Sequence, residues 1–419
     1  MRIFKRSRTG VSNFGTRTIS SLQVPVYRLY FLGMLGQFAS MNMQMVSGSL
    51  LLYRLTGSAA LLGTMSLVLA IPMLFLSMFG GAFADRVQKK HILVIGLGSS
   101  ALISLGVAVA LTTGVLSREN EGSWWILLVS SFLQGSVMGL MMPSRQSIIP
   151  EIVSRDKVMN AVALNMLGMN VFRLAAPSAA GFLIAWFDFK AVYYTMTGMN
   201  IYAMVFILFL PRTGTITSQA SNIVMDIKKG FQYMFRQRTI FFILFFTLIV
   251  VIFSMPYQQL LPIFVDDILG VGEIGMGVLM GVSGAGALFG SLVVASLPNK
   301  RRGLILLISG LISGAALISF SFSTSWTLSL VFMVFVGLGH AVRGTMSNAL
   351  LQTYVEPAYM GRVMSVFMME LGLVSIFTFI AGLMAEVMPV QWVIGGLALI
   401  LAVASILAIT FVPRIRNLD

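Results

Sequence analysis

The stretch Gly81–Lys90, GAFADRVQKK, places an aspartate and three cations directly after a long segment that is almost uncharged. Two roles fit a compact charged cluster at the end of an apolar segment. It is either a solvated loop that only sets the topology of a membrane protein, or a latch that moves during function. The rest of the chain bears on the choice.

The composition of the chain is that of a membrane protein. Of its 419 residues, 57% are hydrophobic and 10% are charged, and the mean hydropathy is +0.91, which is too apolar for an ordinary soluble domain. Lipid offers the backbone no hydrogen-bond partner, so the spanning elements must be helices or a closed barrel. Uninterrupted apolar runs favour helices over alternating strands. We therefore expect an α-helical protein that crosses the membrane many times.

Twelve apolar runs are long enough to cross a bilayer, since about 20 helical residues span its core. The longest charged polar connection, 211–238, divides the runs six and six. We predict an N-terminal tail (1–26), a first six-helix bundle (27–210), a central loop (211–238), a second six-helix bundle (239–412) and a C-terminal tail (413–419). The predicted spans are 27–52, 58–84, 91–115, 123–144, 161–186, 190–210, 239–264, 274–297, 303–322, 326–348, 363–387 and 390–412.

Positive charge is distributed unevenly between the two sides of the predicted membrane. Of the 28 lysines and arginines, only Arg54, Arg118 and Lys190 fall in odd-numbered connections, and Arg173 lies inside a span. By the positive-inside rule, both termini and the central loop face the cytoplasm. The net charge of +14 is then explained by topology and by contact with anionic membrane lipids, and nucleic acid is not expected as a partner.

The sequence also lacks the residues that several kinds of chemistry need. It has no cysteine and two histidines, so thiol nucleophiles and metal sites are not expected. It has no Walker A loop, so we do not expect ATP to drive the protein directly. We predict no enzymatic activity, no catalytic residue, no metal and no cofactor, which leaves an ion gradient as the energy source.

The opening stretch resembles a signature of the major facilitator superfamily. That signature, G-x-x-x-D-R-x-x-[RK]-[RK], lies between the second and third helices of the family, and twelve spans with an inside-facing central loop also match the family's plan. The resemblance implies an all-α membrane protein with twelve transmembrane helices in two pseudo-symmetric six-helix bundles. The matching residues are Gly81, Asp85, Arg86, Lys89 and Lys90.

The resemblance also implies a role for these residues. In the family, the aspartate latches the second helix to the start of the eleventh, where free N–H groups and the helix dipole attract an anion. Asp85 would therefore contact the helix that begins near 361–365. Arg86 and Lys89 would pair with nearby acids such as Glu151.

A second region, 143–181, looks like the branch of the family that includes the enterobactin (siderophore) exporter and macrolide efflux proteins. It implies export of an amphiphilic drug-, macrolide- or siderophore-like molecule by alternating access and proton antiport. We also expect a functional monomer, and the absence of outward N-x-[ST] sequons and of long outer loops fits a bacterial inner membrane. One departure concerns the coupling: Ser131 stands three residues before Gln134, where proton-coupled drug antiporters of the family carry an arginine.

Two other functions fit the same pattern. A lipid or lysophospholipid flippase would share the fold but would need a cavity that opens sideways to the membrane. A membrane sensor or scaffold without transport activity would be expected to have lost the gating signature, and the intact Gly81, Asp85, Arg86 and Lys90 argue against it.

Polar residues follow one face of several predicted spans. In the family, the first, fourth, seventh and tenth helices form the central cavity, and Gln37, Ser40, Gln44 and Ser47 lie on one face of the first. Because a polar stripe is costly in lipid, it should face the cavity or a neighbouring helix. Hydrogen bonding between helices is an equally good explanation for any single residue. The candidates on the other three helices are Gln134 and Met138; Ser254, Tyr257 and Gln258; and His340 and Arg343.

Two ionisable residues inside spans complete the candidate set. Arg173 would either attract an anionic group of the substrate or bond carbonyls in a helix that Pro177 kinks. Glu370 is the best candidate for a group that carries a proton, and the alternatives are an ion pair or a water-filled vestibule.

Overall fold

The computed structural model describes residues 20–211, 232–297, 300–356 and 359–418, and within them the side chains of 78–86, 295, 361, 365, 368 and 371 are not described. A short 3₁₀ helix, η1 (Ser20–Gln23), precedes the first half. The helices of that half are α2 (Pro25–Thr56), α3 (Ala59–Arg86), α4 (Lys89–Thr112), α5 (Trp125–Ser147), α6 (Ile149–Ile152) and α7 (Val158–Leu208).

The helices of the second half follow the central loop. They are α9 (Arg238–Ser254), α10 (Pro256–Ile263), η2 (Phe264–Ile268), α11 (Gly272–Ser296), α12 (Arg302–Ser321), α13 (Trp326–Tyr354), α14 (Met360–Met368), α15 (Glu370–Val387), α16 (Val390–Phe411) and α17 (Pro413–Arg416).

Local sequence signals explain where several of these helices begin and end. Pro25 opens α2, where its missing N–H costs nothing. Gly57 ends α2 in the left-handed conformation (φ 64°), and its N–H donates to the carbonyl of Tyr53 at 2.7 Å. Asp188 breaks α7 with φ 74° and ψ 169°, and its Oδ1 accepts a hydrogen bond from the N–H of Phe189 at 2.6 Å. The break lies in the gap between the fifth and sixth predicted spans.

The twelve predicted spans correspond to the observed helices. In the described part of the chain, nine helices are long and apolar enough to cross a membrane by themselves. The kinked α7 holds two spans, and α14 and α15 together form the eleventh. The first span, α2, is not among these nine; it is less apolar because it contains glutamines and Asn42. The fold class expected from the sequence is confirmed.

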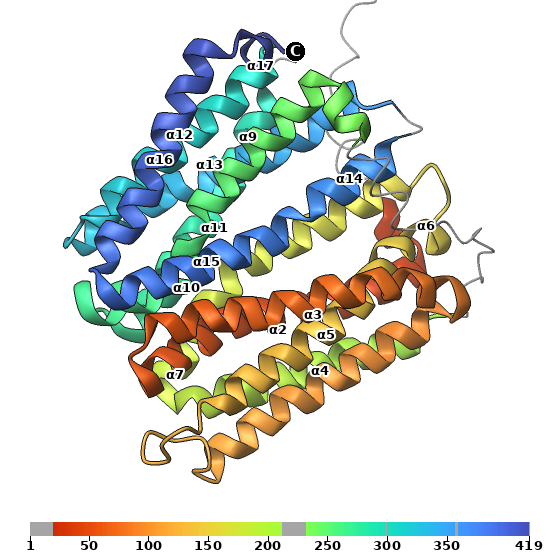
Figure 1. The fold of residues 1–419 in the computed structure, drawn as a ribbon. Helices are drawn as coiled ribbons and strands as arrows, with labels where there is room; N and C mark the ends of the chain where they lie inside the picture. The colour runs from red at the N-terminus through yellow and green to blue at the C-terminus, as the bar shows by residue number, and fades with distance from the viewer. Residues whose placement is uncertain (1–19, 212–231, 298–299, 357–358, 419) are drawn as a thin grey trace, which may run out of the picture.

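The helices pack mainly within two halves, and two helix pairs make most of the contacts between them, with smaller contacts of α10 with α2 and α3. In the first half α2 packs on α7, α3 on α5, and α4 on both α5 and α7. In the second half α11 and α12 pack on α13, and α12 also packs on α16. The pairs that join the halves are α3 with α15 and α7 with α11, and the first of these crosses the middle of Figure 1.

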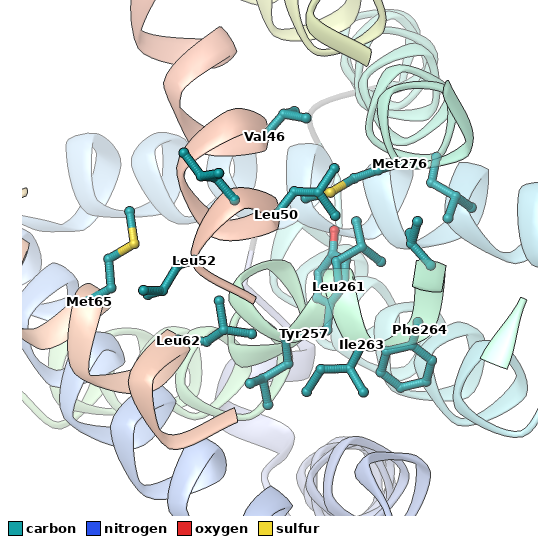
Figure 2. Packing of buried hydrophobic residues seen from close by; sticks show 14 of the residues in the cluster. Val46, Leu50, Leu52, Leu62, Met65, Tyr257, Leu261, Ile263, Phe264 and Met276 are labelled. Carbon is teal, nitrogen blue, oxygen red and sulfur yellow. The ribbon is translucent and has the colours of Figure 1, made fainter. Parts of the chain in front are cut away.

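The apolar cores divide the molecule along its long axis. We call the end that holds Thr56 and Ala59 the outer end, after the predicted orientation, and the opposite end the inner end. At the outer end one core is built from both halves: Figure 2 shows Val46, Leu50 and Leu62 beside Leu261 and Met276. Among the described residues, each half has its own core at the inner end: that of the first half includes Tyr27 and Leu210, and that of the second includes Tyr233 and Leu418.

Glycines bring the two halves into backbone contact near the outer end. A Cβ atom on Gly63 of α3 would lie 2.9 Å from Cα of Phe379, and one on Gly181 of α7 would lie 2.5 Å from the carbonyl oxygen of Glu273. Real Cβ atoms do not approach so closely, so larger residues would push the helices apart. The same close approach thus occurs at both helix pairs that join the halves, as in small-residue contacts between membrane helices.

Candidate functional site

The cations at the end of the opening stretch are held inside the first half. Lys89 is buried and forms an ion pair with Glu151, as expected from the sequence, and its Nζ lies 3.4 Å from the carbonyl oxygen of Ser147. Lys90 Nζ donates to the carbonyl of Leu210 at 2.6 Å. These contacts tie α4 to the segments after α5 and α7. A buried, paired lysine is more than a solvated topology signal.

The rest of the gating signature falls outside the described side chains. Gly81, Asp85 and Arg86 belong to the last turns of α3, whose backbone is helical to Arg86. The predicted contact of Asp85 with the start of the eleventh span therefore stays a prediction.

The polar stripe of the first half is bonded between helices. Ser40 Oγ accepts a hydrogen bond from Asn200 Nδ2 at 2.8 Å, which joins α2 to α7. Ser47 Oγ donates to the carbonyl of Met43 at 3.0 Å, and Gln134 Nε2 donates to Ser100 Oγ on α4 at 3.2 Å. This geometry fits the interhelical explanation for Ser40 and Gln134. The other predicted cavity residues of this half, Gln37, Gln44 and Met138, are buried or half-buried.

The polar candidates of the second half form one group around His340. Its Nε2 lies 2.9 Å from Ser254 Oγ on α9, and its ring lies 6.1 Å from the ring of Tyr257, centroid to centroid. Gln258 Nε2 donates to the hydroxyl of Tyr257 at 3.4 Å. Pro256 starts a new helix, α10, directly after α9, and this break lies between Ser254 and Tyr257, which both lie near the same histidine.

A charged pair lies beside this group. Arg343 Nη1 is 3.5 Å from Glu370 Oε2, and the two side chains are 9% and 14% exposed. Arg173 of α7, in the first half, lies beside α11, since a Cβ atom on Gly284 would be 3.2 Å from its carbonyl oxygen, and α11 packs on α13, which carries His340 and Arg343. The structure thus brings together residues that the sequence offered separately. We call this set the central cluster: Arg173, Ser254, Tyr257, Gln258, His340, Arg343 and Glu370.

The central cluster contains buried polar atoms without a hydrogen-bond partner among the described residues. They are Nε and Nη1 of Arg343 and Nδ1 of His340. Buried polar atoms are normally paired, so these atoms can take up a water molecule or a ligand, or pair after a rearrangement. Among the described residues, no three metal-ligating side chains come together.

A second polar group joins the halves at the outer end. Arg54 of α2 contacts Asp266 through two hydrogen bonds of 3.0 and 3.1 Å and also forms an ion pair with Glu273. Tyr53 donates a hydrogen bond to Asp267. We call the set Tyr53, Arg54, Asp266, Asp267 and Glu273 the outer lock, because it connects α2 with η2 and α11.

Further contacts support the outer lock. Glu386 of α15 accepts hydrogen bonds from the Ser58 hydroxyl and from the N–H of Ala60, the latter at 2.9 Å. Two cavities of about 420 and about 330 Å³ lie at this end, the first lined by Arg54, Leu55, Arg118 and Asp266.

Sequence reasoning missed the outer lock. The signal was present, since Arg54 is one of three cations on the outer side and the acids Asp266, Asp267 and Glu273 fall on that side in the other half. Opposite charges on opposite halves of an otherwise apolar chain indicate a pair. Only the fold shows that the ends of α2 and η2 meet.

These features define a class: a helical membrane carrier in which two bundles close at one end around a polar site between them. Residues 30–378 match the model of the Major Facilitator Superfamily, and the chain belongs to that family.

Individual relatives agree with this assignment. The chain is similar to the staphyloferrin A transporter of Staphylococcus aureus (strain NCTC 8325 / PS 47), with 23% identity over 79% of this chain and 82% of the relative. It is similar to the enterobactin exporter EntS of Shigella boydii serotype 4 (strain Sb227), with 23% identity over 81% of this chain and 80% of the relative. The resemblance to the enterobactin exporter branch is therefore confirmed.

A solved structure supports the fold independently. The nucleoside transporter NupG superimposes with a TM-score of 0.69 over 94% of this chain and 99% of that one, at 14% identity. At this identity the likeness shows the fold alone. The family and relatives establish a membrane transporter of small molecules.

Proposed function

We propose that the protein exports an amphiphilic small molecule from the cytoplasm by alternating access, in exchange for protons. The observation that carries the proposal is the division of the apolar core, which is shared between the halves at the outer end and separate at the inner end. The two halves of a protein built in this way can rock against each other about the central cluster. The exporter name of one relative supports the direction.

The proposal includes an orientation. The charge distribution supports cytoplasmic termini in a bacterial inner membrane, with the protein working as a monomer surrounded by lipid. In this orientation the outer lock closes the exit, so release of the exported molecule requires the pairs of Arg54 with Asp266 and Glu273 to open.

The opposite motion would be controlled by the gating signature. When the inner end closes, Asp85 would reach the start of the eleventh span, and Lys89, fixed by Glu151, would hold the neighbouring helix in place. Asp85→Asn is expected to slow transport while folding and substrate binding are kept. Unaltered transport would reduce the cluster to a topology signal. Val87, which is exposed in the same connection, provides a control as Val87→Ala.

Proton coupling is assigned to Glu370. A carboxylate whose cationic partner is near in one conformation and distant in the other has a proton affinity that depends on conformation, and coupling needs this property. The pair with Arg343 supplies such a partner, and coupling then requires the distance between α13 and α15 to change during the transport cycle.

Uptake into inside-out vesicles tests the proposal. Amphiphilic dyes, macrolides and siderophores are offered with and without an imposed proton gradient. We expect gradient-dependent accumulation of at least one compound in the wild type, loss of it in Glu370→Gln, and no loss in the control Glu356→Gln, whose residue is exposed outside the spans. No accumulation under any gradient, together with transfer of labelled lysolipid between leaflets, would favour a flippase instead.

A further inference from the structure

The central cluster has an excess of positive charge. Arg343 belongs to the second half and Arg173 to the first, where Arg173 lies beside α11 of the second half, and Glu370 is the single carboxylate of the set. Arg173 lies 15 residues after Val158, the start of α7, which corresponds to roughly 22 Å along the helix and so to the interior of the membrane. A charge at that depth is costly, and such charges mark the paths of substrates or ions.

Arg343 is the residue with unused binding capacity. A guanidinium has five N–H donors in a planar fork that matches a carboxylate or phosphate. In Arg343 the distance of 3.5 Å to Glu370 is a weak ion pair, and Nε and Nη1 have no hydrogen-bond partner among the described residues. Because the side chain is more than nine-tenths buried, these donors are not simply solvated.

The neighbouring side chains suit the body of an amphiphilic molecule. Tyr257 contributes an aromatic ring beside His340, and His340 Nδ1 is a further buried group without a described partner. A planar ring next to unpaired polar atoms offers one apolar and one polar contact within the same small volume.

We propose that the transported molecule is an anion, and that a carboxylate group of this molecule binds Arg343 from the second half and Arg173 from the first. One bound carboxylate neutralises the charge that Glu370 leaves uncompensated. Because its two partners belong to different halves, the same group links the bundles while it is bound. The proposal rests on the proposed transport function and names the substrate class of that site.

Equilibrium binding tests the proposal without transport. The probe is propane-1,2,3-tricarboxylate, and its neutral trimethyl ester is the matched control for size and shape. Both are titrated calorimetrically into the full-length protein in nanodiscs of zwitterionic phosphatidylcholine. We expect heat of binding for the tricarboxylate and none for the ester. Equal binding of both compounds, or binding of neither, would overturn the proposal.

Variants locate the bound carboxylate. Arg343→Gln is expected to weaken tricarboxylate binding roughly tenfold or more, since it removes a buried charged partner, and Arg173→Gln should weaken it as well. Arg343→Lys keeps the charge but loses the fork, so it should bind with intermediate affinity if the protein folds. Arg28→Gln, near the inner end of α2, is the control. Unchanged affinity in Arg343→Lys and Arg173→Gln would contradict the assigned site.

Two further arms separate this proposal from others. Repeating the titration with phosphatidylglycerol in the nanodiscs tests whether an anionic lipid headgroup occupies the site, and competition by this lipid would overturn the assignment to a transported carboxylate. The vesicle assay is independent. Gradient-driven accumulation of a neutral or cationic dye, without carboxylate binding, would keep the export function and refute the anionic substrate.

Discussion

The outer and inner ends of the molecule are built differently. At the outer end the two halves share one apolar core, and Arg54 pairs with acids of the other half. At the inner end each half has its own core, and the buried pair of Lys89 with Glu151 lies within the first half. The comparison teaches that contacts between the halves close one end, whereas a buried pair such as that of Lys89 with Glu151 ties segments together within one half.

The largest effect is expected from fixing the outer end closed. The chain has no cysteine, so Ser58→Cys with Glu386→Cys creates one thiol pair across the halves, where those residues are hydrogen-bonded. A short bis-methanethiosulfonate reagent should abolish vesicle transport, because release needs this end to open, and a reductant should restore it.

A pair inside one half serves as control for the cross-link. Ser323 and Ser329 have hydroxyl oxygens 3.1 Å apart within the second half. Cross-linking Ser323→Cys with Ser329→Cys should leave transport unchanged. Equal inhibition by both cross-links would mean that the halves do not separate at the outer end.

A smaller effect is expected from weakening one inner core. Lys89→Gln leaves Glu151 buried without its cation. Breaking a buried pair costs about 3–5 kcal/mol, which corresponds to a fall in melting temperature of roughly 6–20 °C for a bundle of this size. If the inner cores are separate, faster amide hydrogen exchange should appear in the first half and not in the second. Lys90→Gln removes a contact with a carbonyl oxygen and should have less effect.

The smallest effect is expected from the outer lock itself. Arg54→Gln removes a half-exposed cation that contacts two acids, and exposed pairs contribute about 0.2–1 kcal/mol each. Because two pairs are lost, opening of the outer end should increase roughly 2- to 30-fold. The measurement is the labelling rate of Leu55→Cys, which lines the outer cavity, by a membrane-impermeant maleimide.

Two controls, a change of ionic strength and the substitution of a neighbouring cation, make this measurement more specific. High ionic strength should raise labelling of the wild type toward that of Arg54→Gln, because it screens partly exposed pairs. Lys190→Gln removes an exposed cation from the same side and should not change the rate. A rate that is the same in Arg54→Gln and wild type would show that the shared apolar core alone keeps this end closed.

The sequence predicted the elements of the fold better than their contacts. Apolar runs and charge placement gave the twelve spans, and the gap before 190 marked the break at Asp188. Their positions in the sequence could identify Arg343 and Glu370 as ionisable residues inside predicted spans, which are unusual there. They could not show that the two residues pair, because that depends on how α13 and α15 lie against each other.

For the same reason, the sequence identified the polar residues of the candidate site but not their partners. Ser40 and Gln134 have the polarity of cavity residues, yet their partners, Asn200 and Ser100, lie on helices that a single sequence cannot place beside them. Polarity within a span indicates a buried partner. Whether that partner is a ligand or another helix is decided by tertiary structure.

The glycine contacts between the halves have a consequence for kinetics. At Gly63 and Gly181 the backbones of the two halves come into close contact, because neither residue has a side chain. Two helices in close backbone contact can slide past each other with few changes of side-chain rotamer, so the activation barrier of this sliding motion is low. The central cluster would then determine which molecule is carried, whereas these two glycines would set the turnover number, and replacing them would slow the cycle at every substrate concentration.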